Sequence, residues 1–150
     1  MAELRELYQD VILEHSKAPR NYRVLAAPNR TAEGFNPLCG DRYMVYVDLD
    51  GDAIRDIAFQ GSGCAISKAS ASLMTQSVKG KTQAEVEELF GEFHKIVTGD
   101  GPVSGNLPAV GKLSVFAGVS AYPVRVKCAT LAWHTLRAAL AGDPESVSTE

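Results

Sequence analysis

The residues of this chain that could do chemistry are its three cysteines and one aspartate: Cys39, Asp41, Cys64 and Cys128. Cys39 and Asp41 lie in Asn-Pro-Leu-Cys-Gly-Asp, Cys64 in Gly-Ser-Gly-Cys-Ala-Ile-Ser, and Cys128 in Val-Lys-Cys-Ala-Thr-Leu. Each lies beside a turn or at an expected helix start, where a thiolate can be stabilised. Three thiolates and a carboxylate complete a tetrahedral set for Zn²⁺, and thiolates suit an iron–sulfur cluster equally well. The residue types therefore predict sulfur or metal chemistry.

Cys39 and Asp41 are separated by one residue. In extended backbone their side chains would lie on one face, so that a thiolate and a carboxylate could meet one cation. The alternative is a turn, because Asn-Pro can start one and Gly-Asp can close it. The pair gains specificity as a metal site because two further suitable cysteines exist.

Cys64 follows glycines and is expected to open a helix, where main-chain amides favour a thiolate and lower the thiol pKa. The alternative is a small buried core residue. Cys128 lies on the apolar stripe of the last expected helix, so a core role is equally open for it. We expect it in about the first turn, where Arg125 and Lys127 would stabilise a thiolate or contact a partner.

The three histidines, His15, His94 and His134, are ligands by type only. His134 is rotated away from Cys128, His94 lies off the apolar stripe of its helix, and His15 is near a helix end. We expect each of them to be a surface histidine.

Length, charge and composition indicate the kind of domain that carries these residues. A chain of 150 residues with 45% hydrophobic and 22% charged residues is typical of one soluble domain. The net charge of −3 argues against nucleic-acid binding. No stretch approaches the roughly 20 apolar residues of a membrane span, and no signal peptide begins the chain, so we expect a cytoplasmic protein. In a reducing compartment cysteines are more often ligands or catalysts than disulfide partners.

The sequence pattern predicts an α+β fold with a small antiparallel sheet, in which one helix precedes the strands and the other helices follow them. A capping box at Thr82-Gln83-Ala84-Glu85 marks one helix start. The expected helices cover Leu4–Ser16, Ala65–Val78, Thr82 to Gly99, Leu113–Val119 and Pro123 to Gly142. The expected strands are an edge strand near Thr31–Phe35 and a hairpin of Arg42–Leu49 and Ala53–Gln60 turning at Asp50-Gly51. Residues 1–142 would form one domain with a Gly- and Pro-rich loop at Gly99–Gly111, and 143–150 a polar, frayed tail.

Together, the cysteine motifs resemble the U-type iron–sulfur assembly proteins, the superfamily of IscU and of the NifU N-terminal domain. The opening Leu-Tyr-Gln-Asp-Val-Ile-Leu-Glu-His and the following Pro-Arg-Asn resemble the same family, so that the likeness extends from about Leu4 to Leu140. Within it the chain is most similar to the SufU branch. IscU-like proteins have a histidine immediately before the third cysteine, where this chain has Lys127, and a shorter segment between the second and third cysteines.

The resemblance implies a single SufE/NifU-like domain with an antiparallel sheet of about three strands packed against four to six helices. It implies Zn²⁺ bound by Cys39, Asp41, Cys64 and Cys128, with Cys39 as the catalytic residue that accepts persulfide sulfur. The implied partners are a pyridoxal-phosphate-dependent cysteine desulfurase and downstream iron–sulfur assembly or acceptor proteins, with no nucleic acid and no membrane.

Two alternatives to a zinc-dependent sulfurtransferase stay open. One is a non-enzymatic scaffold on which Cys39, Cys64 and Cys128 hold iron in a [2Fe–2S] cluster that is passed to apo-proteins. The other is a purely structural zinc domain for partner binding, which the aspartate disfavours because structural zinc sites usually use four Cys or His ligands.

Overall fold

The computed structural model describes residues 2–37, 40–98, 113, 115–116, 119, 122–142 and 147–148. The described elements follow one another in the order α1 (Ala2–Lys17), β1 (Arg30–Asn36), β2 (Asp41–Asp50), β3 (Ala53–Ser62), α2 (Ala65–Val78), α3 (Gln83–Thr98), α4 (Pro123–Leu140) and β4 (Val147–Ser148). This order confirms the predicted α+β class. Within the described residues, none of the helices is long and apolar enough to cross a membrane.

The sheet has the strand order β3-β2-β1-β4, and its first three strands form the predicted antiparallel sheet. Side chains alternate along β2, because successive residues of a strand point to opposite faces. Its core-facing residues are buried: Tyr43, Val45, Val47 and Leu49. The tight turn between β2 and β3 lies one residue later than predicted, since Asp50 pairs with Ala53 and Gly51-Asp52 connects them. Gly51 has a φ of +64°, the left-handed conformation that glycine adopts at no steric cost.

A β-bulge interrupts this hairpin near its turn. Asp48 pairs with Asp56 and Leu49 pairs with Ile54, so Arg55 is an extra residue on β3. Because of that extra residue Ile54 faces the core opposite Leu49, whereas Arg55 stays outside and donates two hydrogen bonds to Asp48.

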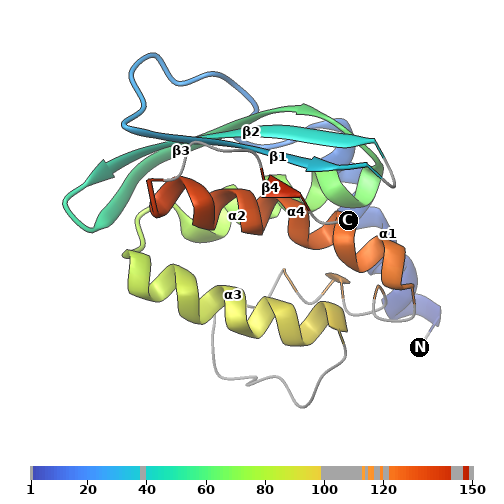
Figure 1. Ribbon diagram of the computed structural model, residues 1–150. Helices are drawn as coiled ribbons and strands as arrows, with labels where there is room; N and C mark the ends of the chain where they lie inside the picture. The colour runs from blue at the N-terminus through green and yellow to red at the C-terminus, as the bar shows by residue number, and fades with distance from the viewer. Residues whose placement is uncertain are drawn as a thin grey trace.

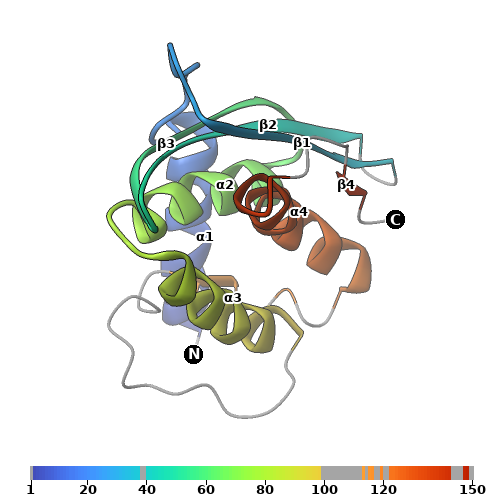
Figure 2. The same ribbon diagram turned by 60° about the vertical axis from the view of Figure 1, so that its left-hand side comes forward.

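The described helices lie on one face of the sheet (Figures 1 and 2). Helix α4 packs beneath β1 and β2, and α2 packs beside it and against β3. The small residues of α2 allow this close approach, and Ser70 Oγ donates to the α4 carbonyl of Ala129 at 2.5 Å. Helix α1 packs on α2, and α3 packs on α4, farther from the sheet.

Helix α3 begins at the predicted capping box. Thr82 N donates to Glu85 Oε1 at 3.0 Å and Glu85 N donates to Thr82 Oγ1 at 3.2 Å. The predicted apolar stripe is buried: Val86, Leu89, Phe90, Phe93, Ile96 and Val97. Gly99–Gly111 lies outside the described residues. Of the expected short helix, Leu113, Val115, Phe116 and Val119 have 3₁₀ conformation and are buried.

Two predictions about the edges of the sheet are wrong. The polar tail was expected to be frayed, but its residues Val147 and Ser148 form β4 and pair in parallel with Gly34 and Phe35 of β1. Strand β1 is therefore not an edge strand, because β4 covers it there. Main-chain hydrogen bonds stabilise this part of the tail.

Candidate metal centre

Three elements that are far apart in the sequence converge at one end of the sheet. Asp41 is the first residue of β2, Cys64 is the N-cap of α2, and Cys128 lies in α4. One carboxylate oxygen and the two sulfur atoms all lie within 4.8 Å of one another. Cys39, the fourth residue of the predicted set, lies outside the described residues. The fold thus brings together the three predicted ligands that it describes.

Asp41 is fully buried, which a simple turn residue would not be. Its carboxylate accepts hydrogen bonds from Cys64 N at 2.8 Å and from Asn36 Nδ2 at 3.3 Å. Of the two alternatives for this segment, the described residues have the turn, because Gly40 has a φ of +72° and its N–H donates to the Asn36 carbonyl at 2.8 Å. The chain turns sharply here, and the strand pairing of Asn36 with Asp41 fixes the aspartate.

Cys64 opens α2 as predicted, and its half-buried side chain caps the helix. Its Sγ accepts a hydrogen bond from Ser67 N at 3.4 Å. The hydrogen bond with Cys128 is the largest cause that lowers the pKa of Cys64 to about 6, against the opposing effect of burial. The bonds with Ser67 act in the same direction as Cys128. This sulfur is therefore predisposed to be a thiolate, the form that binds metals.

Cys128 is buried, with 1% of its surface exposed, and it is the sixth residue of α4. It therefore lies in the second turn rather than at the helix start, because the helix already begins at Pro123. Arg125 is exposed, and its guanidinium lies 5.8 Å from the ring centre of Tyr122. Asn36 Nδ2 instead donates to Cys128 Sγ at 3.5 Å. One amide thus binds both Cys128 and Asp41.

Gly63 allows the chain to pass directly over these groups. A Cβ at this position would lie 2.5 Å from Asp41 Oδ1 and 2.6 Å from both Ser67 Oγ and Tyr43 OH, so no larger residue fits. Tyr43 lies on the core side of the sheet and is fully buried, and burial raises its pKa far above the usual value. The phenol therefore keeps its proton.

Sequence reasoning missed three residues of this centre: Asn36, Tyr43 and Ser67. Ser67 had a signal, since it lies three positions after a predicted helix cap. Asn36 also had a signal, because it is the first residue of the first cysteine motif. Tyr43 had none, because an aromatic residue in a strand is ordinary.

The histidines lie outside this centre. The expectation for His15 is wrong, because it is only 2% exposed and its Nδ1 lies 2.7 Å from Ser72 Oγ. His94 is exposed as expected. His134 is half-buried with its ring centre 5.3 Å from that of Phe90, and burial lowers its pKa, with Arg137 and His94 acting in the same direction.

The donor set fits zinc. Sulfur atoms bound to one tetrahedral Zn²⁺ at about 2.3 Å are about 3.8 Å apart, so donors already within 4.8 Å need to close by an ångström or less. The buried carboxylate and two thiols would supply three ligands. The same soft sulfur donors also suit an iron–sulfur cluster.

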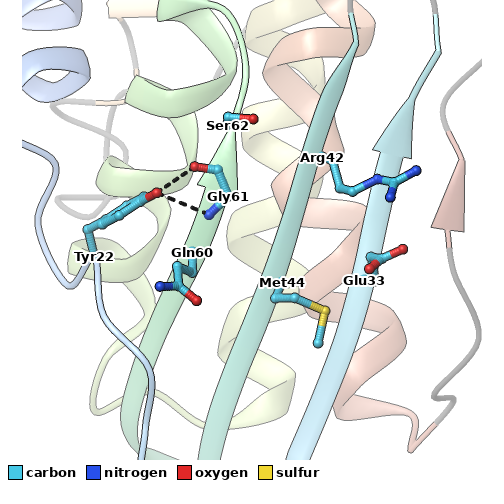
Figure 3. Close-up of a pocket in the computed structure, with 7 residues that line it drawn as sticks. All are labelled: Tyr22, Glu33, Arg42, Met44, Gln60, Gly61 and Ser62. Atoms are coloured by element: carbon cyan, nitrogen blue, oxygen red, sulfur yellow. Dashed lines mark hydrogen bonds between the residues drawn. The ribbon is translucent and has the colours of Figure 1, made fainter.

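A pocket of about 350 Å³ lies on the other face of the sheet, beside the strand ends that carry the centre (Figure 3). It is lined by Tyr22, Glu33, Arg42, Met44, Gln60, Gly61 and Ser62. Tyr22 OH donates to the Gly61 carbonyl and accepts from Gly61 N at 3.3 Å. Neither Asp41 nor the two described cysteines line this pocket, so it is separate from the metal centre.

Residues 7–142 match the model of the NifU-like N terminal domain, and the chain belongs to this family of iron–sulfur cluster assembly proteins. It is 40% identical over 143 residues to the zinc-dependent sulfurtransferase SufU of Bacillus subtilis, covering 93% of both chains. It is also 40% identical over 141 residues to the iron–sulfur cluster assembly scaffold protein IscU of Streptococcus pyogenes, covering 93% of this chain and 86% of the relative.

The fold is shared with a solved structure of the same family. A protein of Fervidobacterium islandicum, described as an iron–sulfur cluster assembly scaffold protein for the SUF system, superposes with a TM-score of 0.81. The two are 36% identical, and the match covers 87% of this chain and 94% of that one. The predicted family and the single-domain α+β architecture are confirmed.

Proposed function

We propose that this protein accepts persulfide sulfur from a cysteine desulfurase on Cys39 and relays it toward iron–sulfur cluster assembly. Zn²⁺ would be held by Cys39, Asp41, Cys64 and Cys128. The observation that carries the proposal is the convergence of a buried carboxylate and two thiols within 4.8 Å at the end of the sheet. The similarity to a zinc-dependent sulfurtransferase supports zinc as the metal.

The transfer is an exchange of sulfur between thiolates. The Cys39 thiolate attacks the outer sulfur of the desulfurase persulfide, the donor's S–S bond breaks, and the donor cysteine leaves as a thiolate. No net oxidation occurs, and the acceptor repeats the step when it receives the sulfur. Bound zinc would keep cysteine ligands deprotonated at neutral pH.

The other two cysteines are less suited to this role. Cys64 is fixed as the cap of α2, and Cys128 lies in the second turn of α4 with 1% of its surface exposed. Release of Cys64 from a metal would remove the cap of α2, and the buried Cys128 cannot reach a partner without movement of α4. Cys39 lies in the short connection between β1 and β2, and residues of such connections are more easily displaced.

A cluster scaffold is the second candidate function, because the same thiols could hold a [2Fe–2S] cluster and one relative is named as a scaffold. Lys127 precedes Cys128 here, where IscU-like proteins have a histidine. The chain then lacks one ligand and acid–base group of such a scaffold, which favours sulfur relay.

The test supplies the purified protein with a cysteine desulfurase and cysteine, and maps persulfide by peptide mass spectrometry. We expect persulfide on Cys39, a strong rise in sulfide release over desulfurase alone, and loss of that rise in Cys39→Ser with much of the zinc retained. Persulfide on Cys64 or Cys128 would refute the assigned acceptor. A stable [2Fe–2S] spectrum that displaces zinc after anaerobic addition of ferrous iron would favour the scaffold. Zinc binding without any persulfide would indicate a structural zinc domain.

A further inference from the structure

A buried phenol lies against the metal centre without being one of its ligands. We propose that Tyr43 is a positioning residue that acts through Ser67 to hold the sulfur of Cys64 on the metal. This inference rests on the proposed metal site, and it concerns which ligand stays in place when sulfur is transferred.

The contacts form a chain from the sheet to the cysteine. Tyr43 lies on the helix-facing side of β2 and is fully buried. Its hydroxyl lies 2.8 Å from Ser67 Oγ, and Ser67 Oγ donates to the Cys64 carbonyl at 3.0 Å. Ser67 N lies 3.4 Å from Cys64 Sγ. Ser67 therefore contacts both the main chain and the sulfur of Cys64.

The direction of these hydrogen bonds follows from counting protons. A serine hydroxyl has one proton to donate. Ser67 donates it to Cys64, so Tyr43 must be the donor in its bond to Ser67. Without the phenol, the Ser67 hydroxyl could turn toward other acceptors and would no longer fix the first turn of α2.

The position of the Tyr43 hydroxyl is itself fixed. Its ring centre lies 5.9 Å from that of Phe59, which in turn packs edge-on against Tyr22 at 5.2 Å. Gly63 passes so close that a Cβ there would lie 2.6 Å from the hydroxyl. The phenol is therefore packed between the sheet and the start of α2.

This arrangement matters because Cys64 has two tasks. Its sulfur caps α2 and is also aimed at Asp41 and Cys128. The sulfur of Cys64 caps the first turn of α2, so its position depends on that turn. If Cys64 is to stay on the metal while Cys39 is released, the turn must be held in place. The strand that begins with Asp41 supplies that support through Tyr43, so two ligands are positioned by one strand.

The test compares Tyr43→Phe with Tyr46→Phe. Tyr46 is on the same strand but on the opposite, half-buried face, so it controls for the loss of a phenol from β2. Zinc affinity is measured by competition with a chromophoric chelator. We expect it to fall about fivefold in Tyr43→Phe, as the loss of one neutral hydrogen bond predicts, and to be unchanged in Tyr46→Phe. The thiolate-to-metal absorption of the Co²⁺-loaded protein should change only in Tyr43→Phe, and a merely structural role would not move it.

A double-mutant cycle tests whether Tyr43 acts through Ser67. Ser67→Ala should lower zinc affinity, and Tyr43→Phe in that background should lower it no further, within about twofold. Additive losses, or wild-type affinity and an unchanged Co²⁺ spectrum in Tyr43→Phe, would overturn the inference alone. Wild-type protein that binds neither zinc nor cobalt would overturn the metal site and the proposed function with it.

Discussion

Two buried polar clusters lie on helix α2, one at its N-terminus and one halfway along it. The first is the metal centre. The second joins α2 to α1 and to the segment that follows α1, and we call it the α1–α2 tie: His15, Arg20, Asn21, Ser72 and Thr75. Both clusters contain residues that can bind metals or protons in other proteins, but they differ in how their polar groups are satisfied.

In the α1–α2 tie, hydrogen-bond donors meet acceptors within the protein. Ser72 Oγ lies 2.7 Å from His15 Nδ1 and accepts from Arg20 N at 2.8 Å. Asn21 Nδ2 donates to Thr75 Oγ1 at 3.0 Å, and Thr75 Oγ1 donates to the Ser72 carbonyl at 2.7 Å. Such a cluster needs nothing from outside the protein, so its contribution is to stability.

The metal centre instead gathers acidic groups. Two sulfur atoms and a carboxylate converge, and within the part of the chain that the structure describes no arginine, lysine or histidine forms an ion pair with Asp41. Burial of negative groups together is costly unless a cation joins them. A buried cluster of acidic groups that lacks a cationic side chain is therefore a better indication of a bound cation than a cluster of matched hydrogen bonds.

Removal of the metal should have the largest effect and should separate the two clusters. Bound at about 1,000 times its dissociation constant, zinc would stabilise the fold by about 4 kcal/mol, and this corresponds to about 10 °C in Tm. Wild-type protein should therefore melt about 10 °C lower after chelation, measured by calorimetry. Cys128→Ala should melt low with or without chelator, and a chelator-dependent Tm in this variant would contradict its role as a ligand.

His15→Ala should break the α1–α2 tie without touching the metal centre. It removes a buried ring and leaves Ser72 Oγ without one partner, so we expect the free energy of unfolding to fall by about 2–3 kcal/mol in urea titration. Zinc affinity should stay at the wild-type value. His94→Ala is the control. Because His94 is exposed, its replacement should lower the free energy of unfolding by less than about 0.5 kcal/mol. A loss of zinc in His15→Ala would mean that the two clusters are not independent.

Asp41→Asn tests the charge of the metal centre at nearly constant shape. The amide oxygen can still accept from Cys64 N, but the negative charge is gone, so zinc affinity should fall at least about tenfold, or about 1.4 kcal/mol. Asp41→Ala should in addition slow sulfur turnover, because it leaves a three-thiolate site with an open position. Unchanged affinity and turnover in both variants would reduce Asp41 to a structural residue.

Thr75→Val should have the smallest effect of the four. The change keeps the shape of the buried side chain and removes the hydroxyl that accepts from Asn21, so about 1 kcal/mol of stability should be lost. The loss of stability is measured by chemical denaturation with and without zinc. The same loss should appear under both conditions, and a loss confined to the zinc-bound form would contradict the separation of the two clusters.

Much of the fold follows from local signals in the sequence. Helix α2 begins and ends at the predicted residues, because glycines precede its cap, and the capping box marks the start of α3. The sequence around His15 also indicates that it is buried. It follows Val11 and Ile12 by four and three positions, so it lies on the same buried face of α1. Strand β4 had no sequence signal, because a segment of two residues forms a strand only by pairing with a strand that is already in place.

The convergence of Asp41, Cys64 and Cys128 could be predicted because three cysteines and an aspartate in these motifs have few other uses together. Their supporting contacts could not. Asn36 reaches both Asp41 and Cys128 only through the pairing of β1 with β2 and the packing of α4 below them. The left-handed conformation of Gly40 likewise depends on the connection between two strands whose register the sequence does not state.

The β-bulge at Arg55 bears on how this family can vary in length. Asp41 faces the metal centre only while the register of β2 against its neighbours is kept, and a slip of one residue would turn it to the other face. The bulge lies between the turn and the paired segment from Tyr43 to Val47. We therefore expect insertions or deletions at the Gly51-Asp52 turn to be absorbed at the bulge, without a change in the position of Asp41 at the far end of β2.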